Sequence, residues 1–512
     1  MNESREKRTN EMRRSSHYAR AVLLGVLLVQ LSSTGQEANP APPAGNDLRE
    51  LREKINELEQ KLKALEGRLA TESTTNTKDQ RIEQLDQKVR VLERNHELEQ
   101  EANEGKAKEL PKVSFGDKGF NFSSADTNFV LQLKGVLQVD SRTFFGDSGI
   151  VGNDGILLRR ARPVLQGTVF RDFDYMFVPD FGGTTPQIFD AYVNYRYSPA
   201  LQLQAGKFKT PVGLEQLQAD RDLFFNERAL PTDLVPNRDL GFMLHGDLLG
   251  QTLTYAVGIF NGVGDARNSS NVSVEDNKAF AGRIFAQPFN ETSLTPLQQL
   301  GVGLSGSYEA AQGTSTADLP NNNGFATVGQ QTFFAYSPTN RSVVAEGTHW
   351  RLSPQAWYFY GPFDLLGEYV ISDQGVGLAG NGPATAANLR NTSWQIAGGW
   401  VLTGEKSSFS GIEPRHPFDP RRGHWGAWQV VARYSQLDID SAAFPRFADS
   451  LASAHSAREW SLGINWYLNS NLRFDTSFAH TAFDGGGVRA GAVGAVTRKD
   501  ENVLFTRLQL AF

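Results

Sequence analysis

The chain has 512 residues, a formal net charge of −6 at pH 7 and no cysteine. The mildly acidic balance argues against nucleic-acid binding, which normally needs a basic surface, and the lack of cysteine excludes disulfides, thiol nucleophiles and Cys-ligated metals. No apolar run beyond the N-terminal signal region is long enough for a spanning helix. A transmembrane β-barrel stays possible, because its apolar residues alternate with polar ones.

The first 35 residues have the pattern of an export signal. Basic residues precede an apolar run that is too short to span a membrane, and small residues follow it. We expect cleavage after Gly35, with Ala38 as the second possibility. Met12 is an alternative start, because the charged stretch before it is long for a signal peptide. A Pro/Ala-rich linker follows at 36–46.

Residues 47–105 carry a heptad pattern, interrupted by a polar stretch at 71–77. The apolar positions are Leu48, Leu51, Ile55, Leu58, Leu62, Leu65 and Leu69, and then Ile82, Leu85, Val89 and Leu92. The pattern predicts a periplasmic coiled coil, because a helix with one narrow apolar stripe needs partners to bury it. A solvated single helix is the alternative. The expected purpose is oligomerisation, and tethering to peptidoglycan is the second possibility.

After Pro111 the period changes to two. In 459–468, for example, Trp460 and Leu462 alternate with Ser461 and Gly463, and such alternation predicts strands with one apolar and one polar face. About sixteen segments have this pattern, an even number as in bacterial single-chain barrels. They are 129–145, 156–170, 173–181, 187–197, 201–208, 240–247, 252–260, 280–287, 300–309, 350–360, 363–372, 393–403, 428–435, 459–468, 472–481 and 503–512.

Short connections alternate with long polar ones, as in transmembrane barrels. The connection at 404–425 is long where a short periplasmic turn is expected. It is therefore either a real excursion at the periplasmic end of the barrel or a sign of a wrong strand count. A soluble sandwich would also alternate, but aromatic residues at the strand ends favour a membrane girdle. We therefore expect an all-β fold over 112–512, a transmembrane antiparallel β-barrel of about 16 strands, preceded by the N-terminal α-helical coiled coil.

The stretch 206–241 does not alternate. It is long, contains three prolines, and carries charges of both signs that nearly cancel. Connections of this length in compact domains are usually functional or disordered, and its phenylalanines and leucines argue against disorder, because they need something to pack on. We therefore expect this stretch to be ordered and functional.

Several segments of the chain resemble the phosphate-selective outer-membrane porins of the porin O and P family. They are GKFKTPVGLEQL (206–217), FNERALP (225–231), VPNRDLG (235–241), GAWQVVARYS (426–435), GINWYLN (463–469) and FTRLQLAF (505–512). The resemblance covers the chain from about Phe120 to the end. It implies a homotrimeric barrel in the outer membrane of a Gram-negative-type cell, with the loop at about 209–238 folded into the lumen. The coiled coil lies outside it.

Passive passage of an anion needs basic groups in a wet lumen and binding weak enough for release. The polar strand faces carry more basic than acidic residues. The candidate pore-lining residues are Lys207, Lys209, Arg160, Arg162, Arg283, Arg433, Arg507, Arg221, Arg228 and Arg238. Cross-strand pairing is the alternative role for many of them, and the arginines of 206–241 could pin that stretch to the wall. Because the charges of the stretch 206–241 nearly cancel, we expect the arginines of the barrel wall to contribute more to anion selectivity than the arginines of this stretch.

No nucleophile motif, Gly-rich phosphate cradle or metal-spaced cluster is found, so we expect no enzymatic activity, no cofactor and no metal. The expected partners are outer-membrane lipid, small anionic solutes and further copies of the chain. The expected function is passive diffusion of small anions, such as phosphate or polyphosphate, through a constricted basic lumen. The alternatives are a non-selective porin, or a mainly structural barrel whose coiled coil oligomerises or tethers the outer membrane to the cell wall.

Overall fold

The computed structural model describes residues 53–64, 75–117, 119–146, 152–183, 185–271, 276, 278–311, 318–320, 324–337, 342–379, 386–486 and 498–512. The chain divides into two units, Met1–Ala102 and Asn103–Phe512. The predicted signal peptide and the linker at 36–46 lie outside the described residues. Within the described ranges, no helix combines the length and the apolar character needed to cross a membrane.

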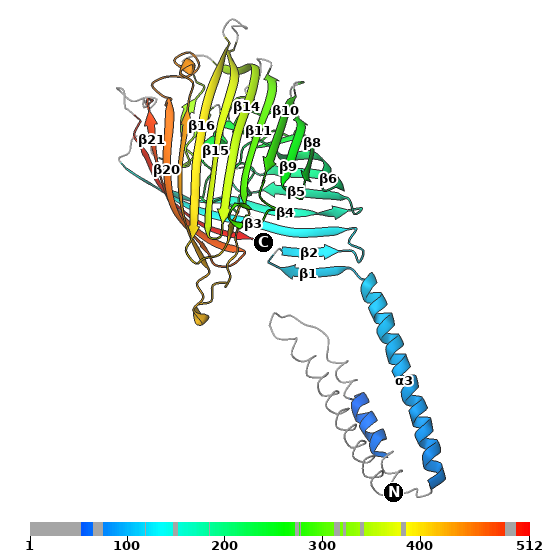
Figure 1. Ribbon diagram of the computed structural model, residues 1–512. Coiled ribbons are helices and arrows are strands. Elements are labelled where there is room, and N and C mark those ends of the chain that lie inside the picture. Colours follow the sequence, from blue (N-terminus) through cyan, green and yellow to red (C-terminus); the bar gives the residue numbers. More distant parts are fainter. Residues whose placement is uncertain are drawn as a thin grey trace. The chain divides into compact units, whose positions relative to one another are not determined.

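The first unit is helical where it is described. Residues 53–64 form a helix, and α3 runs over Thr75–Glu109 (Figure 1). α3 thus continues past Gly105 and ends just before Pro111, because proline lacks an N–H donor and disfavours the helical conformation of the residue before it.

The described seam positions are uncovered within the single chain. Leu58, Leu62, Leu85 and Leu92 are 55–66 % exposed. The predicted positions Leu48, Leu51, Leu65 and Leu69 lie outside the described residues. A narrow apolar stripe of this kind is stable in water when a partner helix covers it.

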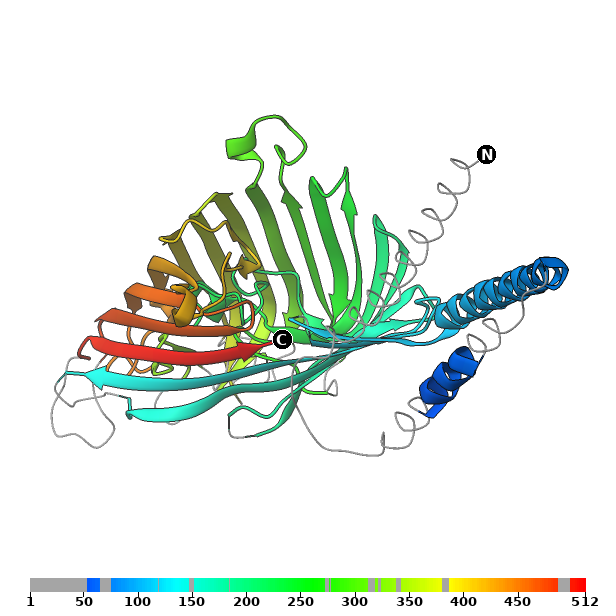
Figure 2. The same cartoon turned by 90° about the horizontal axis from the view of Figure 1, so that it is seen from below.

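In the second unit, 18 strands of the described residues form one antiparallel sheet, and 16 of them close into a barrel. Closure occurs because the last strand pairs with the first strand of the ring, from Asn502↔Phe145 to Ala511↔Val136. Figure 2 shows the red β22 beside the cyan β3. The barrel strands are β3 (Val130–Phe145), β4 (Gly155–Val169), β5 (Phe173–Asp180), β6 (Gln187–Ser198), β7 (Leu201–Lys209), β8 (Arg238–Leu248), β9 (Leu253–Phe260), β10 (Ala279–Ala286), β11 (Leu300–Ala311), β14 (Val343–Tyr360), β15 (Phe363–Leu378), β16 (Ala387–Val401), β19 (Ala427–Asp438), β20 (Ser456–Tyr467), β21 (Leu472–Asp484) and β22 (Glu501–Ala511).

Each segment predicted from the alternation has its counterpart among these strands, so the predicted antiparallel barrel is confirmed. β14, β15 and β16 extend farther than the alternation indicates. In β15, the residues 372–378 are all buried, because other parts of the chain cover both of their faces. Their side chains therefore do not alternate between apolar and polar, and the period-two pattern ends early.

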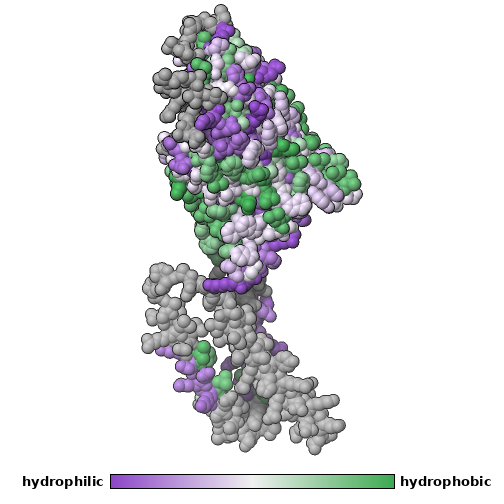
Figure 3. Space-filling view, turned by 90° about the vertical axis from the view of Figure 1, so that its left-hand side faces the viewer, coloured by the Kyte–Doolittle hydropathy of each residue, from purple (hydrophilic) through white to green (hydrophobic). Residues whose placement is uncertain are grey.

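The outer surface of the barrel is apolar. In β20, Trp460, Leu462 and Ile464 are 40–55 % exposed, whereas Ser461 and Asn465 on the other face are buried. Figure 3 shows apolar residues gathered over the middle of the barrel and polar residues toward its upper end. This arrangement is the one expected of a barrel with lipid outside and a polar interior.

The long connection at 404–425 lies at the end of the short turns. β16 and β19 pair directly, from Thr392↔Asp438 to Val401↔Gln429, so the strand count holds and the excursion is real. The connection contains β17 (Ser407–Ser408) and β18 (Gly411–Ile412) and forms the gold segment below the strands in Figure 1.

A hairpin precedes the barrel and packs beside its seam. β1 (Lys112–Gly116) pairs with β2 (Gly119–Ser123), which in turn pairs with the start of β3. Phe512 exchanges two backbone hydrogen bonds of 3.0 Å with Gly135, and its ring centroid lies 6.2 Å from that of Phe120. A Cβ at Gly135 would lie 3.0 Å from the Phe512 ring, so glycine allows this close approach.

Gly206 in β7 is a test of backbone crowding. Its φ is 134°, and a Cβ would collide with the carbonyl oxygen of Ala191 and lie 2.7 Å from the Cα of Tyr192. We expect Gly206→Ala to lower the free energy of unfolding by about 2–4 kcal/mol, the sum of an unfavourable backbone conformation and overpacking. Urea unfolding in lipid vesicles, followed by tryptophan fluorescence, measures it.

The matched control is Gly404→Ala. Gly404 also has a positive φ, 85°, but no atom lies within 4 Å of its built Cβ, so we expect only the backbone cost of about 1–2 kcal/mol. Equal losses in the two variants would contradict the steric argument.

Candidate pore constriction

Residues 210–237, here called the inward loop, connect β7 to β8 and cross the lumen. Their backbone is held by side chains from distant strands. The N–H of Leu214 donates to Glu368 of β15 (2.7 Å), Asn465 of β20 donates to the carbonyl of Phe224 (2.9 Å), and Gln509 of β22 donates to the carbonyl of Arg221 (3.0 Å). The loop is therefore fixed on several sides of the barrel.

An apolar cluster anchors one side of the inward loop. Leu214, Phe224 and Phe225 are buried against apolar side chains on the inner faces of five strands. These strand residues are Phe285, Phe359, Leu366, Ala397 and Val431. The cluster explains why a charged stretch contains phenylalanines and leucines: burial of their apolar area stabilises the loop in the lumen.

Asp220 of the inward loop is surrounded by three arginines. Arg162 and Arg228 each donate a hydrogen bond to its carboxylate, and the Nη2 of Arg160 lies 3.5 Å from it. Burial alone would raise the pKa of Asp220, but the three guanidinium groups hold the pKa well below its usual value. Asp220 is therefore ionised throughout the physiological range.

Glu227 is surrounded in the same way. Its Oε1 lies 2.6 Å from Nε of Arg159, 3.0 Å from Nη2 of Arg142 and 3.9 Å from Nη2 of Arg507. Burial opposes ionisation here too, but the neighbouring arginines lower the pKa of Glu227. Charged contacts thus join the wall and the loop at both Asp220 and Glu227.

The positive charge at these two points exceeds the negative charge. Six arginines surround the two loop carboxylates, and two further acids take part: Asp180 pairs with Arg162 (2.6 Å) and Asp140 pairs with Arg507 (2.6 Å). Six positive groups therefore face four negative ones. We call this set of ten residues the arginine centre.

A β-bulge brings Arg159 into the arginine centre. The register between β3 and β4 shifts from Gln138↔Arg160 to Val139↔Leu158, so Arg159 is the extra residue and both Arg159 and Arg160 face inward. Sequence reasoning missed Arg159, because strict alternation places it on the outer face. The three arginines at 159, 160 and 162 were the feature of the sequence that could have indicated its inward position.

Most of the predicted pore-lining residues form hydrogen bonds or ion pairs in the structure. Arg160, Arg162, Arg228 and Arg507 lie in the arginine centre. Arg433 is buried beside it and pairs with Glu459 (3.1 Å).

The other predicted residues have hydrogen bonds or ion pairs with groups outside the four acids of the arginine centre. Arg238 pairs with Asp190 (3.1 Å) and Arg283 donates to Gln355 (3.1 Å). Lys207 and Lys209 donate to backbone carbonyls, those of Ser269 and Gln218 (both 2.7 Å), so they hold loops in place. Arg221 differs, because its side chain is 47 % exposed.

Two cavities lie toward opposite ends of the lumen. The loop-side cavity, of about 250 Å³, is lined by Arg159, Arg160 and Arg228 together with Thr327 and Gln330 of the connection between β11 and β14.

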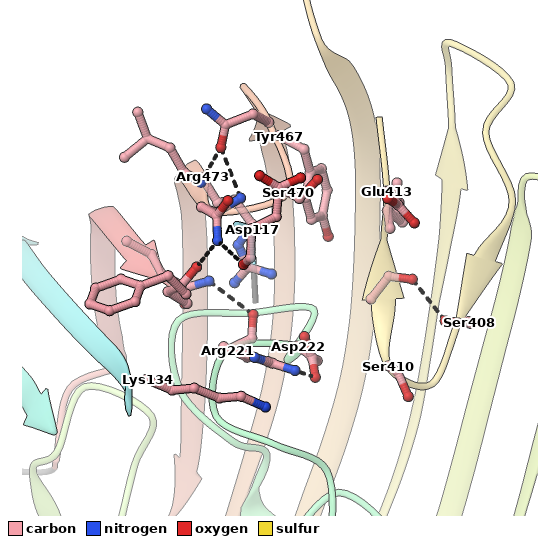
Figure 4. Close-up of a pocket in the computed structure, with 18 residues that line it drawn as sticks. Asp117, Lys134, Arg221, Asp222, Ser408, Ser410, Glu413, Tyr467, Ser470 and Arg473 are labelled. Atoms are coloured by element: carbon pink, nitrogen blue, oxygen red, sulfur yellow. Dashed lines mark hydrogen bonds and ion pairs between the residues drawn. The ribbon is translucent and has the colours of Figure 1, made fainter. Parts of the chain in front are cut away.

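The turn-side cavity has a volume of about 600 Å³. Arg221, Lys134 and Arg473 line it on one side, and Ser408 and Ser410 of the long turn lie across from them (Figure 4). The loop-side cavity is thus at the end of the long loops and borders the arginine centre, whereas the turn-side cavity is at the end of the short turns.

Comparison with known proteins agrees with this architecture. The family model of the phosphate-selective porin O and P matches residues 131–512. Porin O of Pseudomonas aeruginosa is 24 % identical over 395 residues, which cover 72 % of this chain and 86 % of that protein.

Two solved structures align with the barrel. The outer membrane channel DcaP of Acinetobacter baumannii has a TM-score of 0.47 at 11 % identity and covers 76 % of this chain and 99 % of its own. The anion-selective porin from Comamonas acidovorans has a TM-score of 0.44 at 11 % identity, and the alignment covers 75 % of this chain and 99 % of that porin. Because the family match includes all of the barrel from β3 onward except its first residue, the chain belongs to the phosphate-selective porin O and P family and is an outer-membrane porin.

Proposed function

We propose that the protein is a passive diffusion channel for small anions, such as phosphate, and that the arginine centre sets its selectivity. The observation that carries this proposal is the excess of six arginines over four carboxylates in the arginine centre. A positive centre lowers the energy of an anion in the pore and raises that of a cation.

The geometry also suits transient binding. Among the described residues, Nε of Arg142, Nε of Arg160 and Nη1 of Arg507 are buried without a hydrogen-bond partner. Arginine presents several donors that match the oxygens of phosphate. Asp220 and Glu227 compete for the same donors, so an entering oxyanion replaces part of a carboxylate contact and the carboxylate displaces it again. Such exchange keeps binding weak enough for release.

We further propose that the protein is a homotrimer whose coiled coil lies in the periplasm and joins the three chains. The support is the uncovered heptad seam, together with the resemblance to trimeric porins. Tethering to peptidoglycan is the alternative role of the coiled coil. A non-selective pore or a mainly structural barrel are the alternatives to anion selectivity.

Selectivity is tested by replacing Arg159. We expect the wild-type protein in a planar bilayer to give an anion-selective reversal potential under a KCl gradient. Arg159→Gln should lower the anion-to-cation permeability ratio by about thirtyfold, because one unit charge about 4 Å from an ion in water is worth about 1 kcal/mol, and it acts with opposite sign on the anion and on the cation.

Arg422→Gln is the control, since the Arg422 side chain is 78 % exposed and does not line either cavity. A cation preference of the wild type would overturn the proposed function. A chloride current indifferent to added phosphate would overturn phosphate as the solute.

The coiled coil is tested at its seam. Leu58→Asn removes an apolar seam side chain, and we expect it to weaken trimer association by about 2–5 kcal/mol, as for loss of a buried leucine. Sedimentation in detergent measures the fraction of trimer. Lys61→Asn, off the seam on the same helix, should leave this fraction unchanged. An intact trimer that no longer binds purified peptidoglycan would instead support tethering.

Selectivity should also depend on pH through Asp222. Burial raises the pKa of this carboxyl to about 6, and it lies 3.6 Å from Arg221. It is charged at pH 8 and neutral at pH 5, so the positive charge of Arg221 is uncompensated at low pH. We expect the anion preference to rise as the pH falls through about 6. Asp222→Asn should show the high anion preference at both pH 5 and pH 8. If the anion preference of this variant still changed with pH, another group would be the one that titrates.

A further inference from the structure

The turn-side cavity contains buried hydrogen-bond donors that the described part of the chain does not satisfy. Arg473, at the start of β21, is only 3 % exposed. Its Nε donates to Asp475 (2.9 Å), but Nη1 and Nη2 have no hydrogen-bond partner among the described residues. Burying donors without acceptors is costly. Two terminal nitrogens of one guanidinium match the two oxygens of a carboxylate or phosphate.

Further positive groups lie on the same wall of the cavity. Figure 4 shows Lys134 of β3 and Arg221 of the inward loop below Arg473. Arg221 is the most exposed of the pore-lining arginines predicted from the sequence, and its backbone carbonyl is fixed by Gln509. This wall of the cavity therefore presents the two buried Nη donors of Arg473 and, near them, the exposed guanidinium of Arg221.

The cavity is larger and more apolar than a simple ion requires. Its volume of about 600 Å³ falls in the range of sites for small organic molecules, roughly 300–1,000 Å³. Ile412, Leu472 and Phe512 line it. The ring of Tyr467 also lines it, 5.4 Å from Cζ of Arg473. An apolar body attached to the anionic end could thus be buried at the same time.

The long turn builds the opposite wall. The ring of Phe409, between β17 and β18, packs 4.4 Å from that of Trp357, and its carbonyl accepts a hydrogen bond from Gln218 of the inward loop (3.0 Å). Ser407 donates to Asp364 of β15 (2.6 Å). These contacts hold the hairpin in the lumen, so the cavity has a fixed shape.

We propose that the turn-side cavity is a binding site for organic anions that carry one carboxylate or phosphate-ester end and a small apolar body. Arg473 holds the anionic end, and Ile412, Leu472 and Phe512 contact the body. Asp222 and Glu413, which also line the cavity, disfavour a second negative charge and keep the affinity low. The proposal rests on the proposed function, since the organic anion is a solute of the same channel.

Block of the chloride current by benzoate in a planar bilayer tests the site, with the probe added to each side in turn. We expect benzoate to reduce the current at concentrations about tenfold lower than acetate, which has the same carboxylate without the ring. Arg473→Gln should raise the half-blocking concentration of benzoate about tenfold, the effect expected for lost hydrogen bonds to a charged group. Arg421→Gln, an exposed arginine at the same end, should leave it unchanged.

A second variant separates binding from folding. Ser410→Trp fills the cavity but keeps the pair of Arg473 and Asp475, and we expect it to weaken the benzoate block as well. Equal block by benzoate and acetate, or unchanged block in both variants, would overturn the site. If the wild type is then still anion-selective by reversal potential, only this inference fails. A cation-selective wild type would show that the proposed function fails too.

Discussion

The lumen depends on the pairing of two carboxylates of the inward loop with arginines of the wall and the loop. Asp220 and Glu227 each contact three guanidinium groups. Without the loop, the wall arginines of β3, β4 and β22 would repel one another in a partly dry interior, and without the arginines the loop would bury uncompensated carboxylates, which is strongly destabilising. The loop crosses the barrel because each set of charges needs the other there.

This pairing also explains how a loop of nearly neutral charge can lie in a positive pore. The loop lowers the charge of the wall without cancelling it, and the remaining excess is shared among groups that already have partners. An anion therefore meets a modest attraction and exchangeable contacts. An apolar cluster also anchors the loop, and the arginine centre borders the loop-side cavity through Arg159, Arg160 and Arg228.

The strands were predictable because lipid outside and polar contacts inside impose a period of two on each of them. The prediction ended early in β15, where residues 372–378 are buried on both faces, and it missed Arg159, because a bulge changes which side chains face inward. Arg507 was correctly placed on a polar face, but its partner Asp140 lies 367 residues away in the sequence, and no local pattern indicates that pair. For the same reason the sequence did not indicate the β17–β18 hairpin of the long turn. Its place in the lumen depends on contacts with Trp357 and Gln218, which are distant in the sequence.

The seam between β22 and β3 has a consequence for biogenesis. In hydrocarbon, each unpaired backbone group costs several kcal/mol, and the ladder between these strands runs to Ala511. A chain that ends before its last strand therefore leaves the edges of β3 and β21 open and cannot settle in the bilayer as a stable ring. Only a chain that includes β22 can therefore form the closed barrel, because β3 has its second neighbouring strand only when β22 pairs with it.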